Sequence, residues 1–189
     1  MIGKVRAWQF QRKARDLTEQ KGLAIEGPVQ VDERFDTLWR AVEDRWRICL
    51  IRDSTFLKWR FEQHPVRDYK IWAARREGDL VGYAVTDVLR RDGMARGRIV
   101  DMLAHPDVPE AAELLLFHAA AQLCSEGADM LVGWFLPRTF WAPLLDKVGM
   151  RYRGDRRNII VRLFAAENMR NEIFDPENWY YTGADTDQL

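Results

Sequence analysis

The sequence predicts an α/β fold in which helices flank a mixed, mostly antiparallel sheet of six to seven strands. Two β-rich runs surround Glu77-Gly78-Asp79, which is the pattern of a hairpin. A further β-rich run, 96–104, precedes a long apolar helix and then the short apolar run 129–137. A helix that joins two strands usually makes them parallel, so one parallel pair is expected beside the antiparallel ones.

The chain opens with a predicted helix over residues 4–23, which Gly22 would end. Its larger apolar residues make a poor stripe: Val5, Trp8, Phe10 and Leu17. A helix this polar is expected outside the main core. We therefore interpret residues 1–25 as a connector and residues 26–189 as one domain. The N-terminal residues have no long apolar run, so neither a signal peptide nor a membrane anchor is expected.

The next elements are defined by turn and cap residues. Residues 27–33 are the first strand candidate. Asp36 is expected to cap one helix, and Ser54 is expected to cap a second that stops before Pro65. The hairpin region then predicts three consecutive antiparallel strands over residues 69–104.

The second half alternates helices and strands. The almost wholly apolar run 129–137 favours a central strand buried on both faces. Gly127 and Gly149 suit the ends of the helices on either side of it. The expected elements are a helix over 109–124, a strand over 129–137, a helix over 138–150 and strands over 152–164 and 178–187.

Composition limits the classes of function. The chain has 189 residues, 47% of them hydrophobic, with 29 basic and 29 acidic residues and no formal net charge. This balance disfavours a general nucleic-acid binder. Cys49 and Cys124 are expected to be buried free thiols, which fits the reducing cytoplasm. The sequence contains no P-loop, dinucleotide fingerprint, zinc pattern or Ser-His-Asp order. His118 lies on an apolar helix and is expected to be a satisfied core histidine.

Three stretches carry a resemblance to a known family: REGDLVGYAV (76–85), MLAHPDVPEAAELLL (102–116) and FWAPLLDKVGMRY (140–152). Over about residues 27–189 they resemble, in order, two strands, a strand–loop–helix junction and the penultimate helix of the GNAT acyltransferases. The resemblance implies an acyl-CoA-dependent N-acyltransferase that uses acetyl-CoA or another acyl-CoA as cosubstrate. The acceptor would be an amine of a small molecule or sugar.

Two further stretches, FLKWRFEQHP (56–65) and NWYYTGADTD (178–187), resemble the C-terminal half of tandem GNAT-like proteins linked to polysaccharide biosynthesis. That resemblance implies a second GNAT-like half beside this chain. Trp8 and Phe10 on the first helix would then be exposed aromatics at a contact surface. We expect residues 1–24 to dock either against another copy of the chain or against a separate GNAT-like protein.

The resemblance breaks at two places. The family's loop reads Gln/Arg-x-x-Gly-x-Gly/Ala, and its amides hold the CoA pyrophosphate. Here Glu110, Ala112 and Leu114 stand in that region, and Pro109 removes one amide donor. Glu110 would also bring a negative charge toward the phosphates. Leu145 stands where the family often has a tyrosine that acts as general acid.

The resemblance also assigns candidate site residues. The cosubstrate would lie between two strands at Met102, Leu103 and Ala104 and at residues 131–134, with loop contacts at Ala111 and Ala112. Asp101 would be a general base, or otherwise a strand-end carboxylate paired with Arg98 or with a helix N-terminus.

Aromatic residues supply the remaining candidates. Tyr152, Tyr180 or Tyr181 would replace the missing acid, or would be ordinary strand aromatics. Trp59 and Trp134, with Trp141, would form a substrate wall, or would simply fill the core. No metal site is expected.

Three functions remain open at this point. The first is acyl transfer from acyl-CoA to an amine. The second is a GNAT-like binding or assembly module without chemistry, because a fold does not fix a function. The third is transfer from aminoacyl-tRNA, which the neutral charge disfavours. Neither a nucleic acid nor a membrane is expected as a partner.

Overall fold

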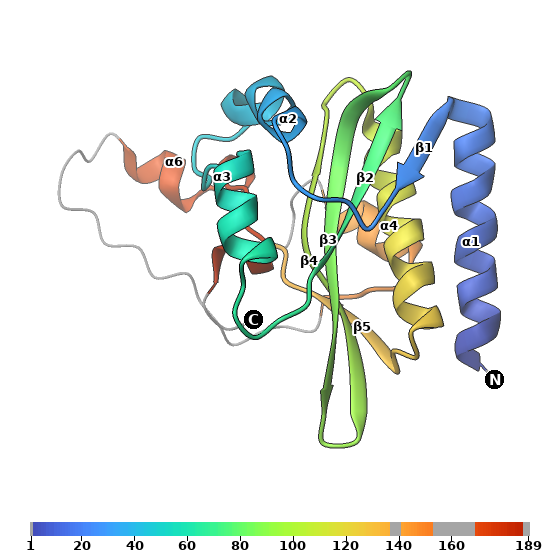
Figure 1. Ribbon diagram of the computed structural model, residues 1–189. Coiled ribbons are helices and arrows are strands. Elements are labelled where there is room, and N and C mark those ends of the chain that lie inside the picture. The colour runs from blue at the N-terminus through green and yellow to red at the C-terminus, as the bar shows by residue number, and fades with distance from the viewer. Residues whose placement is uncertain (1, 137–140, 153–168, 187–189) are drawn as a thin grey trace.

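The computed structural model describes residues 2–136, 141–152 and 169–186. Its centre is a twisted sheet with helices on both faces (Figure 1). Neighbouring strands are antiparallel except for the last pair, which is parallel. The strands follow one another across the sheet in chain order: β1 (Leu23–Glu26), β2 (Lys70–Arg76), β3 (Asp79–Arg91), β4 (Met94–Ala104) and β5 (Met130–Gly133).

One face of the sheet is covered by α4 (Pro109–Ser125), which packs on β2, β3 and β4. Outside it, α1 (Ile2–Lys21) packs against α4 (Figure 1). The other face carries α2 (Arg34–Val42) and η5 (Gly183–Asp185), which contact β3 and β4. The shorter elements are η1 (Glu43–Arg45), α3 (Ser54–Leu57), η2 (Lys58–Glu62), α5 (Ala142–Lys147), α6 (Arg170–Phe174) and η4 (Pro176–Asn178).

The hairpins form where the sequence predicts them. Glu77 and Gly78 join β2 to β3 with φ of 54° and 95°, and Asp92 and Gly93 join β3 to β4 with φ of 54° and 73°. Two consecutive positive φ values suit the twist of a tight hairpin. The prediction of three antiparallel strands over residues 69–104 is confirmed.

An irregularity in β4 falls beside the candidate base. Val85 pairs with Asp101, whereas Thr86 pairs with Ile99, so the register skips Val100. A bulge of this kind bends the strand and redirects the side chains that follow. Asp101 is the first residue after it.

The parallel pairing of β5 with β4 is also confirmed, over Arg96–Met130 to Ile99–Gly133. In the described part of the chain no strand pairs with the same edge of β4 over residues 100–104. The expectation that β5 is buried on both faces is wrong for the described structure. Met130 is exposed and Leu131 to Gly133 are half-buried, because β5 is the last strand in the described sheet.

Two strand expectations need correction. The first strand is Leu23–Glu26 rather than 27–33, because α1 ends at Lys21 and the chain turns at once through Gly22, with φ of 61°. The described sheet has five strands, not six or seven. Of the strand expected over 178–187, the described residues 178–186 do not join the sheet, since Trp179 makes only an isolated bridge with Ile48. The strand expected over 152–164 lies almost wholly outside the described residues.

The helix caps also differ from expectation. Asp53, not Ser54, caps α3, and its carboxylate accepts from the Phe56 amide at 2.7 Å. Asp36 lies in the first turn of α2 and accepts from the Ser54 amide at 2.7 Å and its hydroxyl at 3.0 Å. Asp36 therefore ties two helices together instead of capping one.

The N-terminal helix is part of the packed structure. Ala7 and Ala14 are buried, and the Phe10 ring stacks on Phe117 of α4 with centroids 6.3 Å apart. The helix therefore joins the core through small residues, contrary to the expectation that it lies outside. Trp8 is exposed, with 58% of its surface accessible, as predicted. The division of the chain at residue 25 stays a prediction.

The two cysteines are free and half-buried, and burial raises the pKa of both thiols. No helix among the described residues is long and apolar enough to cross a membrane.

Candidate functional site

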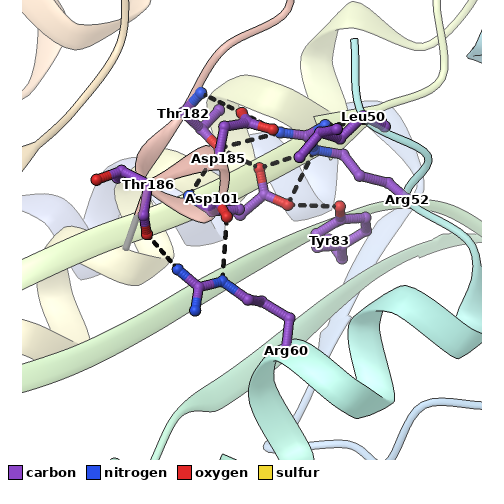
Figure 2. Close-up of polar contacts among 9 residues, drawn as sticks. Leu50, Arg52, Arg60, Tyr83, Asp101, Thr182, Asp185 and Thr186 are labelled. Atoms are coloured by element: carbon purple, nitrogen blue, oxygen red, sulfur yellow. Dashed lines mark hydrogen bonds and ion pairs between the residues drawn. The ribbon is translucent and has the colours of Figure 1, made fainter. Parts of the chain in front are cut away.

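Asp101 lies at the centre of a buried polar cluster (Figure 2). Its side chain has no exposed surface. The Thr182 hydroxyl donates to Oδ1 at 2.8 Å, and the Tyr83 hydroxyl donates to Oδ2 at 2.8 Å. The Arg52 Nε lies 3.3 Å from both carboxylate oxygens. Both oxygens of this carboxylate are thus occupied by protein donors.

Arg52 connects Asp101 to a second carboxylate. One terminal nitrogen of Arg52 donates to Asp185 Oδ2 at 2.5 Å, and the other donates to the Leu50 carbonyl at 2.8 Å. Burial works to lower the pKa of Arg52, but Asp101 and Asp185 outweigh it and hold the pKa above its ordinary value. Burial raises the pKa of Asp185 despite the nearby guanidinium. One buried cation therefore serves two acidic side chains.

The same cluster attaches the C-terminal residues to the sheet. The Thr182 hydroxyl accepts from the Ala184 amide, and Asp185 accepts from the Thr182 amide at 2.8 Å, which makes a capping box. From η2, the Arg60 guanidinium donates to the Ala184 and Thr186 carbonyls (Figure 2). The cluster thus joins β3, β4, the residues before α3 and the C-terminal segment.

This geometry is that of an ion-pair centre. A general base needs a lone pair that can reach the proton of a substrate. Asp101 is fully buried and directs both oxygens at protein donors. The role of Asp101 as a general base stays a prediction. The observed contacts are those of the alternative, a carboxylate held in an ion pair. Its partner is Arg52, however, because Arg98 forms a buried bidentate pair with Asp87.

The loop from β4 to α4 uses its own amide donors. The His105 amide donates to Val81 O at 2.8 Å, and the Asp107 amide donates to His105 Nδ1 at 3.2 Å. The Val108 amide donates to His105 O at 3.0 Å, and the Ala111 amide donates to Val108 O at 2.9 Å. Pro106 and Pro109 have no amide hydrogen to offer.

The last donor in this loop is occupied by a carboxylate. The pKa of Glu110 is lowered by a hydrogen bond from its own backbone amide and by one from Lys21. Lys21 Nζ, at the end of α1, lies 3.0 Å from Oε1, and Arg76 of β2 lies 4.0 Å from Oε2. The N-terminus of α4 thus holds an internal anion, where helix dipoles favour negative charge.

These contacts test whether the junction fits the pyrophosphate of CoA. A pyrophosphate cradle needs backbone amides that are free to donate. Between His105 and Ala111 each amide already has an acceptor, so the loop does not fit a pyrophosphate in this arrangement. The neighbouring edge of β4 differs from the loop, because the structure describes no strand that pairs with residues 100–104 on this edge.

The other residues assigned to the cosubstrate lie at this junction. Met102 and Leu103 are fully buried, and Ala104 is half-buried, all three paired with β3. Ala111 and Ala112 are in the first turn of α4 with fully buried side chains. The structure brings these five residues together around one strand–loop–helix junction. Their binding role stays a prediction.

The aromatic candidates are scattered. Tyr152 is 68% exposed, and Trp59 on η2 is 63% exposed beside Phe56. Trp134 is half-buried just after β5. Trp141 is buried, and its ring lies near Phe135 and Tyr180, so it fills the core. Roles for Tyr152, Trp59 and Trp134 stay predictions.

Sequence reasoning missed Arg52, Tyr83 and Asp185. Arg52 follows the apolar residues Leu50 and Ile51 and precedes the polar residues 53–55, and no pattern there indicates its burial. Thr182 and Asp185 did carry a signal, since a threonine followed three residues later by an acid is a capping-box pattern. In the described ranges no group of three His, Cys, Asp or Glu side chains is placed to hold a metal ion.

Comparisons with known proteins identify the architecture. No family model and no curated protein matches the sequence. Among solved structures, an acetyltransferase of Trypanosoma brucei is similar with a TM-score of 0.54 and 14% identity, over 74% of this chain and 99% of that one. An aminoglycoside acetyltransferase from an uncultured soil sample has a TM-score of 0.55 and 16% identity, over 75% and 96%.

A GNAT-family protein of Desulfovibrio desulfuricans is similar with a TM-score of 0.51 and 15% identity, over 70% of this chain and 87% of that one. At these identities the likeness concerns the fold. The chain has the GNAT acetyltransferase fold.

Proposed function

We propose that the protein is an acyl-CoA-dependent N-acyltransferase whose donor site has lost most of its pyrophosphate contacts. The observation that carries the proposal is the junction of β4, β5 and α4 in a GNAT fold. The pairing of the two strands stops at Ile99 and Gly133, and β4 continues for five residues beyond, through Ala104. Bound acyl-CoA would supply a thioester for direct attack by an amine, with the protein mainly positioning the reactants.

The edge of β4 suits the pantetheine arm of CoA. Strand edges present backbone N–H and C=O groups that pair with any extended amide-bearing chain. The pantetheine arm carries two amides, and residues 100–104 have no described strand partner on this edge. The diphosphate part fits poorly, because the loop amides are used and Glu110 stands at the helix N-terminus. We therefore expect weak binding that the arm dominates.

The acceptor we propose is a primary amine on a small molecule or sugar. The similar soil enzyme is an aminoglycoside acetyltransferase, and aminoglycosides carry amines on sugar rings. The zero net charge of the chain argues for a neutral or small acceptor over a polyanion. The acyl group proposed is acetyl.

The decisive experiment compares acetyl-CoA with S-acetyl-pantetheine by calorimetry on the whole chain. If the arm supplies the binding, acetyl-CoA should bind no tighter than S-acetyl-pantetheine, because an unused diphosphate adds nothing and Glu110 repels it. A family-like pyrophosphate site would instead make acetyl-CoA bind more than tenfold tighter. Acetyl transfer to an amine panel should then be measured under saturating donor.

A second candidate function is a GNAT-fold binding or assembly module without transfer. Two observations favour it. The backbone amides of the β4–α4 loop already donate to acceptors within the protein, and Asp101 is held in an ion pair with Arg52. If neither ligand binds to the unmodified chain or to Glu110→Gln, this candidate replaces the first. Binding of either ligand, together with measurable transfer, would reject it.

We also propose that α1 contributes to association with another copy or another GNAT-like protein. Trp8 is exposed on this helix, whereas Phe10 is turned toward Phe117. The contact surface would therefore be centred on Trp8, with the Arg12 guanidinium 5.9 Å from its ring. The expectation that Phe10 is also exposed on this surface is wrong, because Phe10 is half-buried against α4.

A further inference from the structure

A hollow of about 440 Å³ lies between α1, β1 and α4. This is the size range of small-molecule sites in proteins. Its apolar lining comes from small or aliphatic residues of all three elements: Ala14 of α1, Ala24 and Ile25 of β1, and Leu114 and Ala121 of α4. Three of the five are alanines, so the helices and the strand meet here without filling the space between them.

His118 of α4 gives the hollow a specific polar group. Its Nε2 atom is buried and has no hydrogen-bond partner, contrary to the expectation of a satisfied core histidine. The ring packs against Trp72, and the two ring centroids lie 4.7 Å apart in an edge-to-face arrangement. A buried ring nitrogen without a partner costs free energy that a ligand can recover. Burial lowers the pKa of this imidazole to about 4, so it is neutral at pH 7.

The rim supplies one positive charge. Gln11, Arg15, Thr18 and Gln122 line the hollow, and Arg15 is the charged residue among those lining it. Among the described residues Arg15 has neither an ion pair nor a hydrogen bond. A guanidinium recognises a carboxylate by two parallel hydrogen bonds. One cation matches a monoanion better than a phosphate, which carries up to two charges.

We propose that this hollow binds a small hydroxylated carboxylic acid with an aliphatic body. The carboxylate would pair with Arg15, and the aliphatic carbons would cover the alanine and leucine lining. His118 Nε2 has essentially no accessible surface in this arrangement of the side chains, so the hydroxyl would bond to it after the imidazole ring turns toward the hollow. A hydroxyl group suits either tautomer of the ring because it both donates and accepts.

The site is separate from the proposed transfer site. β1 and β5 are at opposite edges of the described sheet, and the hollow is beside β1. Its occupation would strengthen the contact between α1 and the rest of the protein, since the ligand would touch α1, β1 and α4 together. Ligands that bind only the folded state stabilise it.

The test uses 3-hydroxyoctanoate as the probe and the nitrogen-15 imidazole spectrum of the full chain, which contains three histidines. We expect the His118 signals to shift in a saturable way while those of His64 and His105 stay in place. Octanoate, which lacks the hydroxyl, and 1,3-octanediol, which lacks the carboxylate, should each bind about tenfold more weakly.

Matched variants locate the contacts. Arg15→Gln should weaken 3-hydroxyoctanoate about tenfold, whereas Arg12→Gln on the same helix, outside the hollow, should leave the affinity unchanged. His118→Phe should abolish the preference for 3-hydroxyoctanoate over octanoate. Ala24 is exposed, so Ala24→Leu should fill the hollow without unfolding the chain and should block the probe.

Two results would overturn the proposal. One is a His118 spectrum that does not shift, even when the concentration of 3-hydroxyoctanoate is 20-fold higher than the concentration at which it changes the signal of a hydrophobic dye. The other is probe binding that Arg15→Gln and Ala24→Leu leave unchanged, since that would mean adventitious binding of an amphiphile elsewhere. Neither result depends on acetyl transfer.

Discussion

The two faces of the sheet are held to their covering elements by different interactions. On the α2 face, Arg52 and two carboxylates join β4 to the C-terminal segment inside a buried cluster (Figure 2). On the α4 face, leucines and alanines make the contact. The ion pairs of α4 and of its C-cap residue Glu126 lie at the surface: Lys21–Glu110, Lys147–Glu113 and Lys70–Glu126. Buried charges require their partners, whereas apolar contacts and surface pairs tolerate change. The α2 face should therefore depend on single residues, and the α4 face should not.

The largest effect is expected from Arg52→Met. It leaves Asp101 and Asp185 buried without their cation, which should lower the free energy of unfolding by about 3–5 kcal/mol. Urea denaturation measures the change. Arg47→Met is the matched control, because its pair with Glu172 is exposed and should be worth less than about 1 kcal/mol. Equal effects of the two substitutions would remove the distinction between buried and exposed ion pairs.

The second test concerns the one strongly perturbed titratable group on the α4 face of the described structure. Burial lowers the pKa of His118 to about 4, so the folded state excludes a proton that the unfolded chain binds below about pH 6.5. Stability should fall as the pH drops from about 6.5 to 4, by up to about 3 kcal/mol, and this group should have no effect above 6.5. Denaturation of the unmodified chain and of His118→Phe over this range measures it. A fall of the same size in His118→Phe would assign the effect to other groups.

Asp101→Asn separates a structural role from a catalytic one. The loss of the charge opposite Arg52 should cost on the order of 2 kcal/mol of stability. If Asp101 is also the base, the acetyl-transfer rate should fall and the acid limb of its pH profile should vanish. Asp87→Asn, at the buried pair with Arg98, should show the stability loss alone. An unchanged pH profile in Asp101→Asn would exclude the residue as the base.

A smaller effect is expected at the N-terminus of α4. Glu110→Gln removes the internal anion and should tighten acetyl-CoA binding severalfold. The affinity for S-acetyl-pantetheine should stay the same, because it lacks the diphosphate. Glu126→Gln, at the far end of the same helix, is the control. If Glu110→Gln leaves acetyl-CoA affinity unchanged, the diphosphate does not approach this residue.

The smallest effect on stability is expected at Trp8. Trp8→Ser should change the free energy of unfolding by less than about 0.5 kcal/mol, whereas Phe10→Ser should cost about 1–2 kcal/mol through the lost stacking on Phe117. If α1 is a contact surface, Trp8→Ser should raise the monomer fraction measured by light scattering. An unmodified chain that is already monomeric, and that stays so with GNAT-like partners, would end this proposal.

The local patterns that predicted structure are those in which neighbouring residues decide the geometry. Glycine after an acidic residue gave both hairpins, and the strand–helix–strand spacing gave the parallel pair. The first strand and the cap at Ser54 were misplaced because Gly22 and Asp53 were equally good signals one or a few residues away. For the candidate site, the sequence predicted the strand–loop–helix junction around Ala104 and Glu110. It did not predict the side chains that contact Asp101.

The sequence by itself determined the three antiparallel strands over residues 69–104, the parallel strand after them, the hairpin turns and the absence of glycine from the β4–α4 loop. These follow from backbone preferences and from periodicities of a few residues. Only the tertiary structure decided that Arg52 meets Asp101 and Asp185, which are 49 and 133 positions away in the chain. It likewise decided that three alanines would leave a hollow beside His118. Such contacts depend on how whole surfaces pack, and no local pattern of residues specifies which distant charge or void a side chain will meet.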